Sequence, residues 1–398
     1  MNGTETGSAT LAELCDLISE QVHPADVPEA LYVGLEHVTP GRLRRSGGGI
    51  AADVQSHKYA FRRNDILYGK LRPYLDKAIL ADTDGVCTTE LLVLRAKPGV
   101  DPRFLACLVH DPDFVEHALT GVTGAHHPRT SWAHIAQFEC PRFSYEEQQA
   151  IAALLWRIQD LLKVCEDTLE VAQDLKRAAM RELFTCGLRG EPQKETEIGP
   201  VPESWEIRDF SEAAVLQRGF DLPVSARRAG DVVVFGSNGP VGTHDAVPPG
   251  VSTPTVMVGR SGSVGKVSYC DQRCWPLNTT LFVSDFRGNS PKYVYFWLEH
   301  FDLTRFGQGV SVPTLNRNTF ASVKVAVPTQ DEQREIVAIL DAIDRKIELH
   351  RKKRAVLEEL FKALLHKLMT GEIRVDELDL SALQAPAEPL SPAAEPAV

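Results

Sequence analysis

"EEQQAIAALLWRIQDLL" (Glu146–Leu162) and "DEQREIVAILDAIDRKI" (Asp331–Ile347) decide how this chain folds, because they are two copies of one pattern. Gln148 matches Gln333, and the same offset matches Leu183 with Leu368 well downstream. Upstream the offset drifts, as it does where loops differ in length, and "TTELLV" (Thr88–Val93) aligns with "NTTLFV" (Asn278–Val283). A repeat of this kind predicts a chain built from two similar halves.

Apolar residues recur in both copies at alternating spacings of three and four, which is the heptad seam of a coiled coil. The first seam comprises Ile151, Leu155, Ile158, Leu162, Leu169 and Leu183, and the second Ile336, Leu340, Ile343, Ile347, Leu357, Phe361, Leu364 and Leu368. Each helix of about 40 residues would extend about 60 Å. His350 and Arg354 interrupt the second seam, so each helix needs a partner. We expect the two helices to pair antiparallel, because a globular region separates them. The alternative is two ordinary amphipathic helices on separate domains.

A Gly/Pro-rich region with short β-branched runs precedes each long helix, and it contains one shorter helical pattern. "PRFLACLVH" (Pro102–His110) and "PKYVYFWLEHF" (Pro291–Phe301) are these shorter helices. The fold class is therefore predicted to be α+β, with two mixed α/β domains separated by two long helices in an antiparallel coiled coil, internally duplicated. The predicted boundaries are 1–143 for the first domain, 144–189 for the first long helix, 190–206 for a linker, 207–328 for the second domain, 329–374 for the second long helix and 375–398 for a disordered acidic Pro/Ala-rich tail.

"GRSGSVGKV" (Gly259–Val267) has the look of a nucleotide-binding loop but fails its requirements. The loop needs glycine, four residues, then Gly-Lys-Ser/Thr, whereas here arginine and valine stand at the first and last positions. The stretch instead aligns with "DILYGKLRPY" (Asp65–Tyr74), which places Lys70 opposite Arg260. We therefore predict a strand, a glycine turn and a basic tip in each half.

Composition limits the classes of protein to consider. The 398 residues suggest two or three domains, and no apolar run reaches the roughly 18 residues that span a bilayer. The N-terminus lacks the pattern of a signal peptide, and the eight cysteines lack a disulfide or zinc spacing, which favours reduced thiols and a cytoplasmic protein. A net charge of −11 argues against non-specific coating of nucleic acid, although it permits local basic patches.

The order of these stretches resembles the specificity (DNA-recognition) subunit of a type I restriction–modification system. The resemblance covers nearly all of the chain. Its carriers are "YVGLEHVTPG" (Tyr32–Gly41), "NDILYGKLRPYLDKAILADTDGVCTTELLVLR" (Asn64–Arg95), "GPVPESWEI" (Gly199–Ile207), "TVMVGRSGSVGKV" (Thr255–Val267) and the repeated helix that begins with Glu-Gln.

The resemblance implies two target-recognition domains, each reading half of a bipartite, asymmetric site in double-stranded DNA. It implies that the paired helices act as a spacer and as a platform for two modification (methyltransferase) subunits. Restriction subunits with a motor and a nuclease complete such a system. No cofactor is expected in this chain, whereas S-adenosylmethionine, ATP and magnesium are expected in the partner subunits.

DNA recognition needs cations for phosphates, together with donors and acceptors that reach base edges. The candidates in the first domain are Lys58, Tyr59, Lys70, Arg72, Tyr74, Lys77, His126, His127, Arg129, Thr130 and Ser131. Those in the second domain are Ser237, Asn238, Arg260, Ser261, Ser263, Lys266, Ser311, Thr314, Asn316, Arg317 and Asn318. Solvated surface cations and turn hydroxyls are the alternative for any single residue. The adjacent histidines lack carboxylates or cysteines at ligand spacing, so no metal is predicted.

No catalytic motif stands out. "DPDF" (Asp111–Phe114) lacks the second proline of an adenine methyltransferase loop, and no nuclease or hydrolase constellation follows a strand. We therefore predict a reader without catalytic activity. Two alternatives remain open: a duplicated coiled-coil scaffold or adaptor, and a methyltransferase or nuclease with unrecognised motifs.

Overall fold

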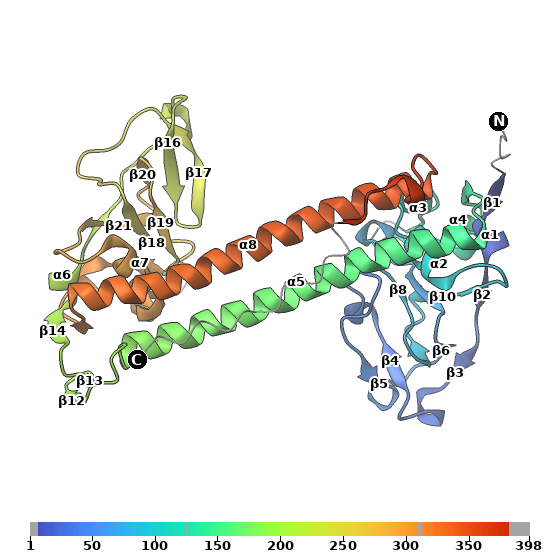
Figure 1. Cartoon of the computed structure of the whole chain (residues 1–398), viewed down its shortest axis with the longest axis horizontal. Coiled ribbons are helices and arrows are strands. Elements are labelled where there is room, and N and C mark those ends of the chain that lie inside the picture. The colour runs from blue at the N-terminus through green and yellow to red at the C-terminus, as the bar shows by residue number, and fades with distance from the viewer. Residues whose placement is uncertain (1–6, 125, 309–312, 382–398) are drawn as a thin grey trace. The chain divides into compact units, whose positions relative to one another are not determined.

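The computed structural model of the chain describes residues 7–124, 126–308 and 313–381 (Figure 1). The chain divides into two compact units, here called the first unit (residues 1–167 with 351–398) and the second unit (residues 168–350). The division falls inside the two long helices, α5 (Tyr145–Thr185) and α8 (Gln330–Met369), rather than at their ends. Each unit therefore contains one globular region and a segment of both helices.

The first unit contains two main sheets. One has the strand order β2-β10-β7-β8 and the other β3-β6-β9-β4-β5. The strands are β1 (Ser8–Thr10), β2 (Cys15–Ile18), β3 (Gln21–Val22), β4 (Leu31–Val33), β5 (Gly49–Ile50), β6 (Lys58–Phe61), β7 (Ile66–Gly69), β8 (Ala78–Leu80), β9 (Gly85–Cys87), β10 (Leu91–Ala96) and β11 (Glu139–Pro141). The shorter helices are α1 (Leu11–Leu14), α2 (Pro102–Leu108), α3 (Pro112–Thr120) and α4 (Trp132–Ile135).

The second unit repeats this architecture with the orders β15-β21-β18-β19 and β17-β16-β20. Its strands are β12 (Gln193–Thr196), β13 (Gly199–Pro202), β14 (Glu206–Asp209), β15 (Val215–Arg218), β16 (Val232–Gly236), β17 (Gly239–His244), β18 (Thr255–Gly259), β19 (Val267–Cys270), β20 (Cys274–Pro276), β21 (Thr280–Asp285), β22 (Gly307–Gln308), β23 (Thr314–Leu315) and β24 (Lys324–Val327). Its shorter helices are α6 (Phe210–Ala213) and α7 (Pro291–Phe301). In both units one parallel pair, β4 with β9 and β16 with β20, interrupts an otherwise antiparallel arrangement.

The duplication predicted from the sequence is confirmed by strand register, with one correction. Gly69 of β7 pairs with Leu91, and Gly259 of β18 pairs with Thr280. Leu91 of β10 therefore corresponds to Thr280 of β21, whereas the sequence alignment matched it with Leu281. The alignment was wrong by one position because it matched similar letters, while the turn before each strand sets the observed register.

The seam residues of α5 and α8 are buried or half-buried. In the first unit, Ile151, Leu155, Ile158 and Leu162 share a core with Leu357, Phe361, Leu364 and Leu368. In the second unit, Leu183 shares a core with Ile336 and Leu340, while Leu169 contacts Ile347 and Ile343. The start of α5 thus packs with the end of α8 and the end of α5 with the start of α8, so the pairing is antiparallel. The same cores contain residues of α2 and α7, so the helix ends also pack on the globular regions.

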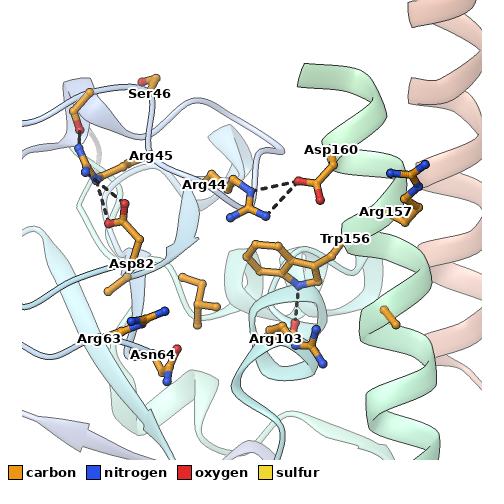
Figure 2. A pocket seen from close by; sticks show the side chains of 14 residues that line it. Arg44, Arg45, Ser46, Arg63, Asn64, Asp82, Arg103, Trp156, Arg157 and Asp160 are labelled. Carbon is orange, nitrogen blue, oxygen red and sulfur yellow. Dashed lines mark hydrogen bonds and ion pairs between the residues drawn. The ribbon is translucent and has the colours of Figure 1, made fainter. Parts of the chain in front are cut away.

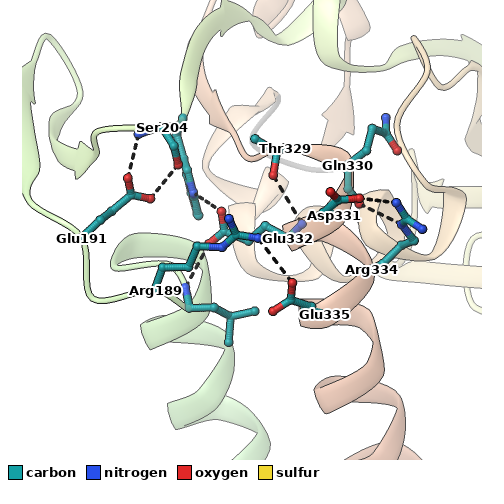
Figure 3. A network of polar contacts seen from close by, with 11 residues as sticks. Arg189, Glu191, Ser204, Thr329, Gln330, Asp331, Glu332, Arg334 and Glu335 are labelled. Atoms are coloured by element: carbon teal, nitrogen blue, oxygen red, sulfur yellow. Dashed lines mark hydrogen bonds and ion pairs between the residues drawn. The ribbon is translucent and has the colours of Figure 1, made fainter. Parts of the chain in front are cut away.

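The segment predicted as a linker, residues 190–206, is a folded hairpin of β12 and β13. Figure 3 shows how it is tied to the start of α8. Buried Glu332 accepts hydrogen bonds from the Leu188 amide at 2.9 Å and from the Trp205 indole at 3.0 Å. Gly187 has a φ of +70°, and a Cβ atom there would lie 2.8 Å from Glu332. This close approach requires glycine.

Ordered structure also continues past the predicted start of the tail. Val375–Glu377 form a 3-10 turn, and Val375, Leu378 and Leu380 pack against the core of the first unit. Residues 382–398 lie outside the described chain. All eight cysteines are free thiols in the structure. Among the described residues, no helix is both long and apolar enough to cross a membrane.

Candidate nucleic-acid interface

Lys70 and Arg260 occupy the same backbone position in the two units. The residue before each donates to the far side of a turn, Gly69 to Lys77 at 2.7 Å and Gly259 to Lys266 at 2.8 Å. Lys70 donates its own amide to the Glu90 carbonyl and accepts from Thr130. Arg260 likewise donates to Thr279 and accepts from Leu315. The predicted equivalence of the two basic residues is therefore confirmed at the level of individual hydrogen bonds.

The glycine turn after β18 folds back on itself and does not form a phosphate cradle. Gly265 donates its amide to the Gly259 carbonyl at 2.9 Å, while Gly259 donates to Lys266. A Cβ atom at Gly259 would lie 1.9 Å from the Ser263 carbonyl oxygen, so only glycine fits. Gly262 and Gly265 both have a positive φ, which glycine adopts at no steric cost. The "GRSGSVGKV" stretch is a tight turn that presents a basic residue, as predicted.

A second loop closes on the tip in the first unit. Leu71 and Arg129 form an isolated β-bridge, and Arg72 donates its amide to the Pro128 carbonyl at 2.7 Å. Arg72 has a φ of +53°, and its side chain is exposed, as is that of Tyr74. The exposed His126, His127 and Ser131 lie on the same loop, whereas Tyr59 on β6 is half-buried. Lys70, Arg72 and Tyr74 therefore form a compact group, here called the first tip.

Four of the predicted first-domain residues are engaged within the protein. Lys58 is 5% exposed, and its ammonium group donates to Ser56. Lys77 donates to the Leu35 carbonyl at 2.6 Å. Arg129 forms a two-pronged ion pair with Glu90 at 2.9 and 3.1 Å, which raises its pKa. Thr130 is buried. The three cations are thus held by contacts within the protein, and sequence reasoning cannot distinguish a solvated cation from one that ties a loop to a strand.

The second tip comprises Arg260 and the residues that surround it. Arg260 is half-buried and donates to the Asn278 carbonyl at 3.4 Å, while Ser261 forms a β-bridge with Thr314. Lys266 donates to the backbone and side-chain oxygens of Asn238 at 2.7 and 2.8 Å. Ser237 and Ser263 are half-buried beside this turn.

The short 3-10 turn that follows β23 carries the remaining second-domain candidates. Asn316 caps this turn by accepting from Asn318 at 3.1 Å, and both side chains are exposed. Arg317 is exposed and donates to the Leu216 carbonyl at 3.4 Å. Ser311 lies outside the described residues.

The "DPDF" segment has a structural role. Asp111 caps α3 by accepting the Asp113 amide at 2.9 Å, and its second oxygen lies 3.5 Å from His366 of α8. These three residues are a grouping of metal-ligand types within the described chain. A helix cap and an ion pair account for the arrangement. Burial raises the pKa of Asp111 to about 6.

Sequence reasoning missed a group of arginines in the first unit. Arg42 contacts Glu166 of α5 and Glu358 of α8 and so joins both helices to the globular region. Arg44, Arg45, Arg63, Arg103 and Arg157 line one cavity (Figure 2). These positions share no spacing along the chain, so no sequence signal predicts their meeting.

Comparisons with known proteins agree with this architecture. Residues 235–359 match the family model described as the type I restriction modification DNA specificity domain. A Methanocaldococcus jannaschii protein, provisionally named the MjaX type I restriction enzyme specificity subunit, is 26% identical over 373 residues, covering 86% of each chain. The crystal structure of a type I restriction–modification S subunit from M. genitalium superposes with a TM-score of 0.65 at 18% identity, covering 93% of this chain and 97% of that one. A structure from a study of type I complex assembly has a TM-score of 0.58 at 18% identity, covering 93% and 99%. Together with the duplicated domains and long helices, these similarities lead to one conclusion: residues 235–359 match a type I restriction modification DNA specificity domain, and the chain resembles type I specificity subunits over most of its length.

Proposed function

We propose that this chain reads a bipartite, asymmetric DNA site, with one globular region recognising each half of the site. The observation that carries the proposal is the equivalence of Lys70 and Arg260, two cations held at one backbone position in two units. Duplicated scaffolds with different side chains at the same place suit the reading of two different base sequences. Lysine and arginine both donate to the N7 and O6 acceptors of guanine and to phosphates.

Each tip offers chemistry for base edges as well as for the backbone. The first tip provides Lys70, Arg72 and Tyr74, with the exposed His126 and His127 on the adjoining loop. The second provides Arg260, with Asn316 and Asn318 exposed nearby. Asparagine pairs with adenine, and arginine pairs with guanine, through two hydrogen bonds each. This difference in composition is the basis we propose for the asymmetry of the site.

The long helices provide two equivalent docking surfaces for modification subunits. On α5, Val164, Val171 and Leu175 are 52%, 67% and 56% exposed. The residues that match them in the repeat are Leu349, Val356 and Leu360 of α8, of which the first two are 64% and 62% exposed. Large exposed apolar side chains at heptad spacing are typical of helix–helix interfaces. One such stripe on each helix supports the binding of two modification subunits.

The chain itself is proposed to contribute recognition and assembly without catalysis. S-adenosylmethionine would bind to the modification subunits, and ATP and magnesium to restriction subunits that join the same complex. The recognition domains would hold the DNA so that an adenine in each half-site reaches a modification subunit. The chemistry of methyl transfer and of cleavage would thus belong to the partners.

The test compares the purified chain, its modification subunit and their complex on a DNA library. The complex with S-adenosylmethionine should methylate adenine at one split sequence, and the chain alone should transfer no methyl group. Methylation by the chain alone would identify an unrecognised methyltransferase. Binding of the complex to DNA without any sequence or salt dependence would favour the scaffold alternative.

A further inference from the structure

A cavity in the first unit concentrates positive charge in a chain whose net charge is −11. Its volume is about 720 Å³, and five arginines line it together with Asp82, Asp160 and Trp156. Figure 2 shows that Arg44 and Arg45 come from one loop, Arg63 from the turn before β7, Arg103 from α2 and Arg157 from α5. Four separate segments of the chain therefore contribute cations to one hollow, here called the arginine cavity.

Acidic neighbours neutralise part of this charge. Arg44 donates to Asp160 at 3.0 Å and lies 4.7 Å above the Trp156 ring. Arg45 forms two hydrogen bonds to Asp82, at 2.9 and 3.1 Å. These contacts hold the two guanidinium groups in fixed orientations, and the Arg44 side chain remains 58% exposed. Fixed guanidinium groups lose little side-chain entropy when they bind a ligand.

Two arginines of the cavity have charges that no neighbouring group neutralises within the described chain. Arg63 and Arg157 are exposed, and within the described chain their guanidinium groups have no hydrogen-bond or ion-pair partner. Arg103, the remaining arginine, pairs with Asp101 at 3.2 Å. The cavity thus carries more positive than negative charge, and its excess lies in groups that are available to a ligand.

The chemistry of the lining selects anionic oxygens rather than a nucleobase. Trp156 is 7% exposed, its indole nitrogen donates to the Arg103 carbonyl, and Arg44 covers its ring. It therefore presents no face on which a base could stack. Guanidinium groups instead match phosphate oxygens, to which they donate two parallel hydrogen bonds.

The equivalent place in the second unit is built differently. At the position that matches Trp156 in the repeat, α8 carries Asp341. Lys292 of α7 forms an ion pair with Asp341 at 3.3 Å and lies 4.3 Å from the Tyr269 ring. Among the described residues at this place, the second unit therefore has a lysine that is paired with a carboxylate and packed against an aromatic ring. The first unit has arginines there that are unpaired in the part of the chain that the structure describes.

We propose that the arginine cavity binds backbone phosphates of DNA beside the half-site read by the first domain, an inference that rests on the proposed function. Sequence-independent phosphate contacts supply much of the affinity of a DNA reader. Lys58, Lys77 and Arg129 of the first domain are engaged within the protein, which leaves Lys70 and Arg72 of the first tip for contacts to DNA. Arg63 and Arg157 would add two cations for the backbone, and Arg44 an oriented third.

The test uses the complex with the modification subunit and the double variant Arg63→Gln/Arg157→Gln. Dissociation constants are measured across a range of salt concentrations on a cognate duplex and on a scrambled duplex. Loss of two phosphate contacts should reduce the slope of log K against log salt by about 2. The affinity should fall by a similar factor on both duplexes, and the methylated sequence should stay the same.

The control is Arg177→Gln/Arg334→Gln, which removes two exposed arginines that pair with aspartates on α5 and α8. It should leave the slope within error of the parent complex. Equal slopes for the cavity variant and this control would overturn the proposal.

Two further measurements identify the ligand by its source. The first measures binding of ATP or pyrophosphate to the DNA-free complex. If this binding is lost in the Arg63→Gln/Arg157→Gln variant while the salt slope of DNA binding is unchanged, the cavity is a free-phosphate site and the proposal is wrong. The second asks whether the cavity variant still binds the modification subunit. Loss of that subunit with an unchanged salt slope would mean that the cavity binds an acidic protein surface, and this result would also overturn the proposal. Failure of the unaltered complex to prefer the cognate duplex would instead refute the proposed function.

Discussion

Gln148 and Gln333 make the same pair of hydrogen bonds in the two units. Each buried side-chain carbonyl accepts from the amide of a helix N-cap, Asp101 at 2.9 Å and Ser290 at 3.0 Å. Each side-chain amide donates to the backbone carbonyl five residues earlier, at 3.0 and 3.1 Å. One glutamine therefore couples the start of a long helix to the start of a domain helix. This coupling explains why the glutamine of the Glu-Gln motif occurs at the start of both long helices.

Replacement of either glutamine by leucine should loosen this junction. The N-cap amide and the backbone carbonyl would both lose their partner in a buried or half-buried setting, at a cost of about 1–3 kcal/mol. Hydrogen exchange of the Asp101 amide in Gln148→Leu, or of the Ser290 amide in Gln333→Leu, should therefore become about 5- to 150-fold faster. Gln149→Leu changes an exposed neighbour and should leave the Asp101 exchange rate unchanged. If the Asp101 amide exchanged at the same rate in Gln148→Leu, in Gln149→Leu and in the wild type, this role of Gln148 would be refuted.

Asp111 should titrate well above an ordinary aspartate. Its burial raises the pKa to about 6, while the nearby His366 lowers it in part. The folded protein therefore binds this proton more tightly than the unfolded chain, whose aspartate pKa is about 3.9. As the pH falls from about 7 to about 4, the wild type should gain about 2 kcal/mol of unfolding free energy relative to Asp111→Asn.

Carbonyl-carbon NMR of Asp111 tests this assignment directly, with the exposed Asp113 as the internal reference. The Asp111 midpoint should lie near 6 and should rise further in His366→Ala, because the cation that favours the charged carboxylate is lost. A midpoint below 4.5 in the folded protein, or a downward shift in His366→Ala, would contradict the account.

The two apolar stripes should be separable by mutation. Val171→Asp/Leu175→Asp on α5 should remove one modification subunit, and Leu349→Asp/Val356→Asp on α8 should remove the other. Each apolar side chain buried at an interface contributes about 1.5–3 kcal/mol, and an aspartate there adds an unpaired buried charge. Native mass spectrometry would then detect complexes with a single modification subunit.

Gln173→Asp is the matched control on α5, since it adds a negative charge at an exposed polar position. It should retain both modification subunits. Two modification subunits on every variant would show that the stripes are not the docking surfaces.

The length of the long helices is predicted to set the unspecified gap in the DNA site. One heptad inserted after Ile158 and after Ile343 keeps the seam in phase and adds about 10 Å. At about 3.4 Å per base pair, the preferred gap should lengthen by up to about three base pairs. Methylation of a library with gaps of every length gives the readout. An active variant with the original gap would exclude the helices as the ruler.

Heptad periodicity made the long helices and their pairing predictable. Leu155 and Leu340 are fully buried, as their seam positions require. The short helices α2 and α7 were also predictable, because each starts with proline after a capping residue and is strongly apolar. The turn at Gly259 was predictable because several glycines close together in the sequence are typical of a tight reversal of the chain.

Whether an individual lysine or arginine is buried or exposed was not predictable from the sequence. Lys58 and Arg63 look alike in sequence, yet Lys58 is buried against Ser56 whereas Arg63 is exposed in the arginine cavity. Tertiary contacts between distant segments decide this difference, and they leave no local pattern. The packing of Leu378 and Leu380 escaped notice for the same reason, since isolated apolar residues in an acidic, Pro/Ala-rich segment resemble a disordered tail.

The central claim is that each unit reads its own half of one DNA site. It is tested most directly by methylation sequencing of a randomised library with three complexes: wild type, Lys70→Ala and Arg260→Ala. A lost two-bond contact to guanine weakens discrimination by about 1–3 kcal/mol at that base pair. Lys70→Ala should therefore relax or weaken one half-site and Arg260→Ala only the other, with the gap unchanged in both. A change in both half-sites after either substitution would contradict the account.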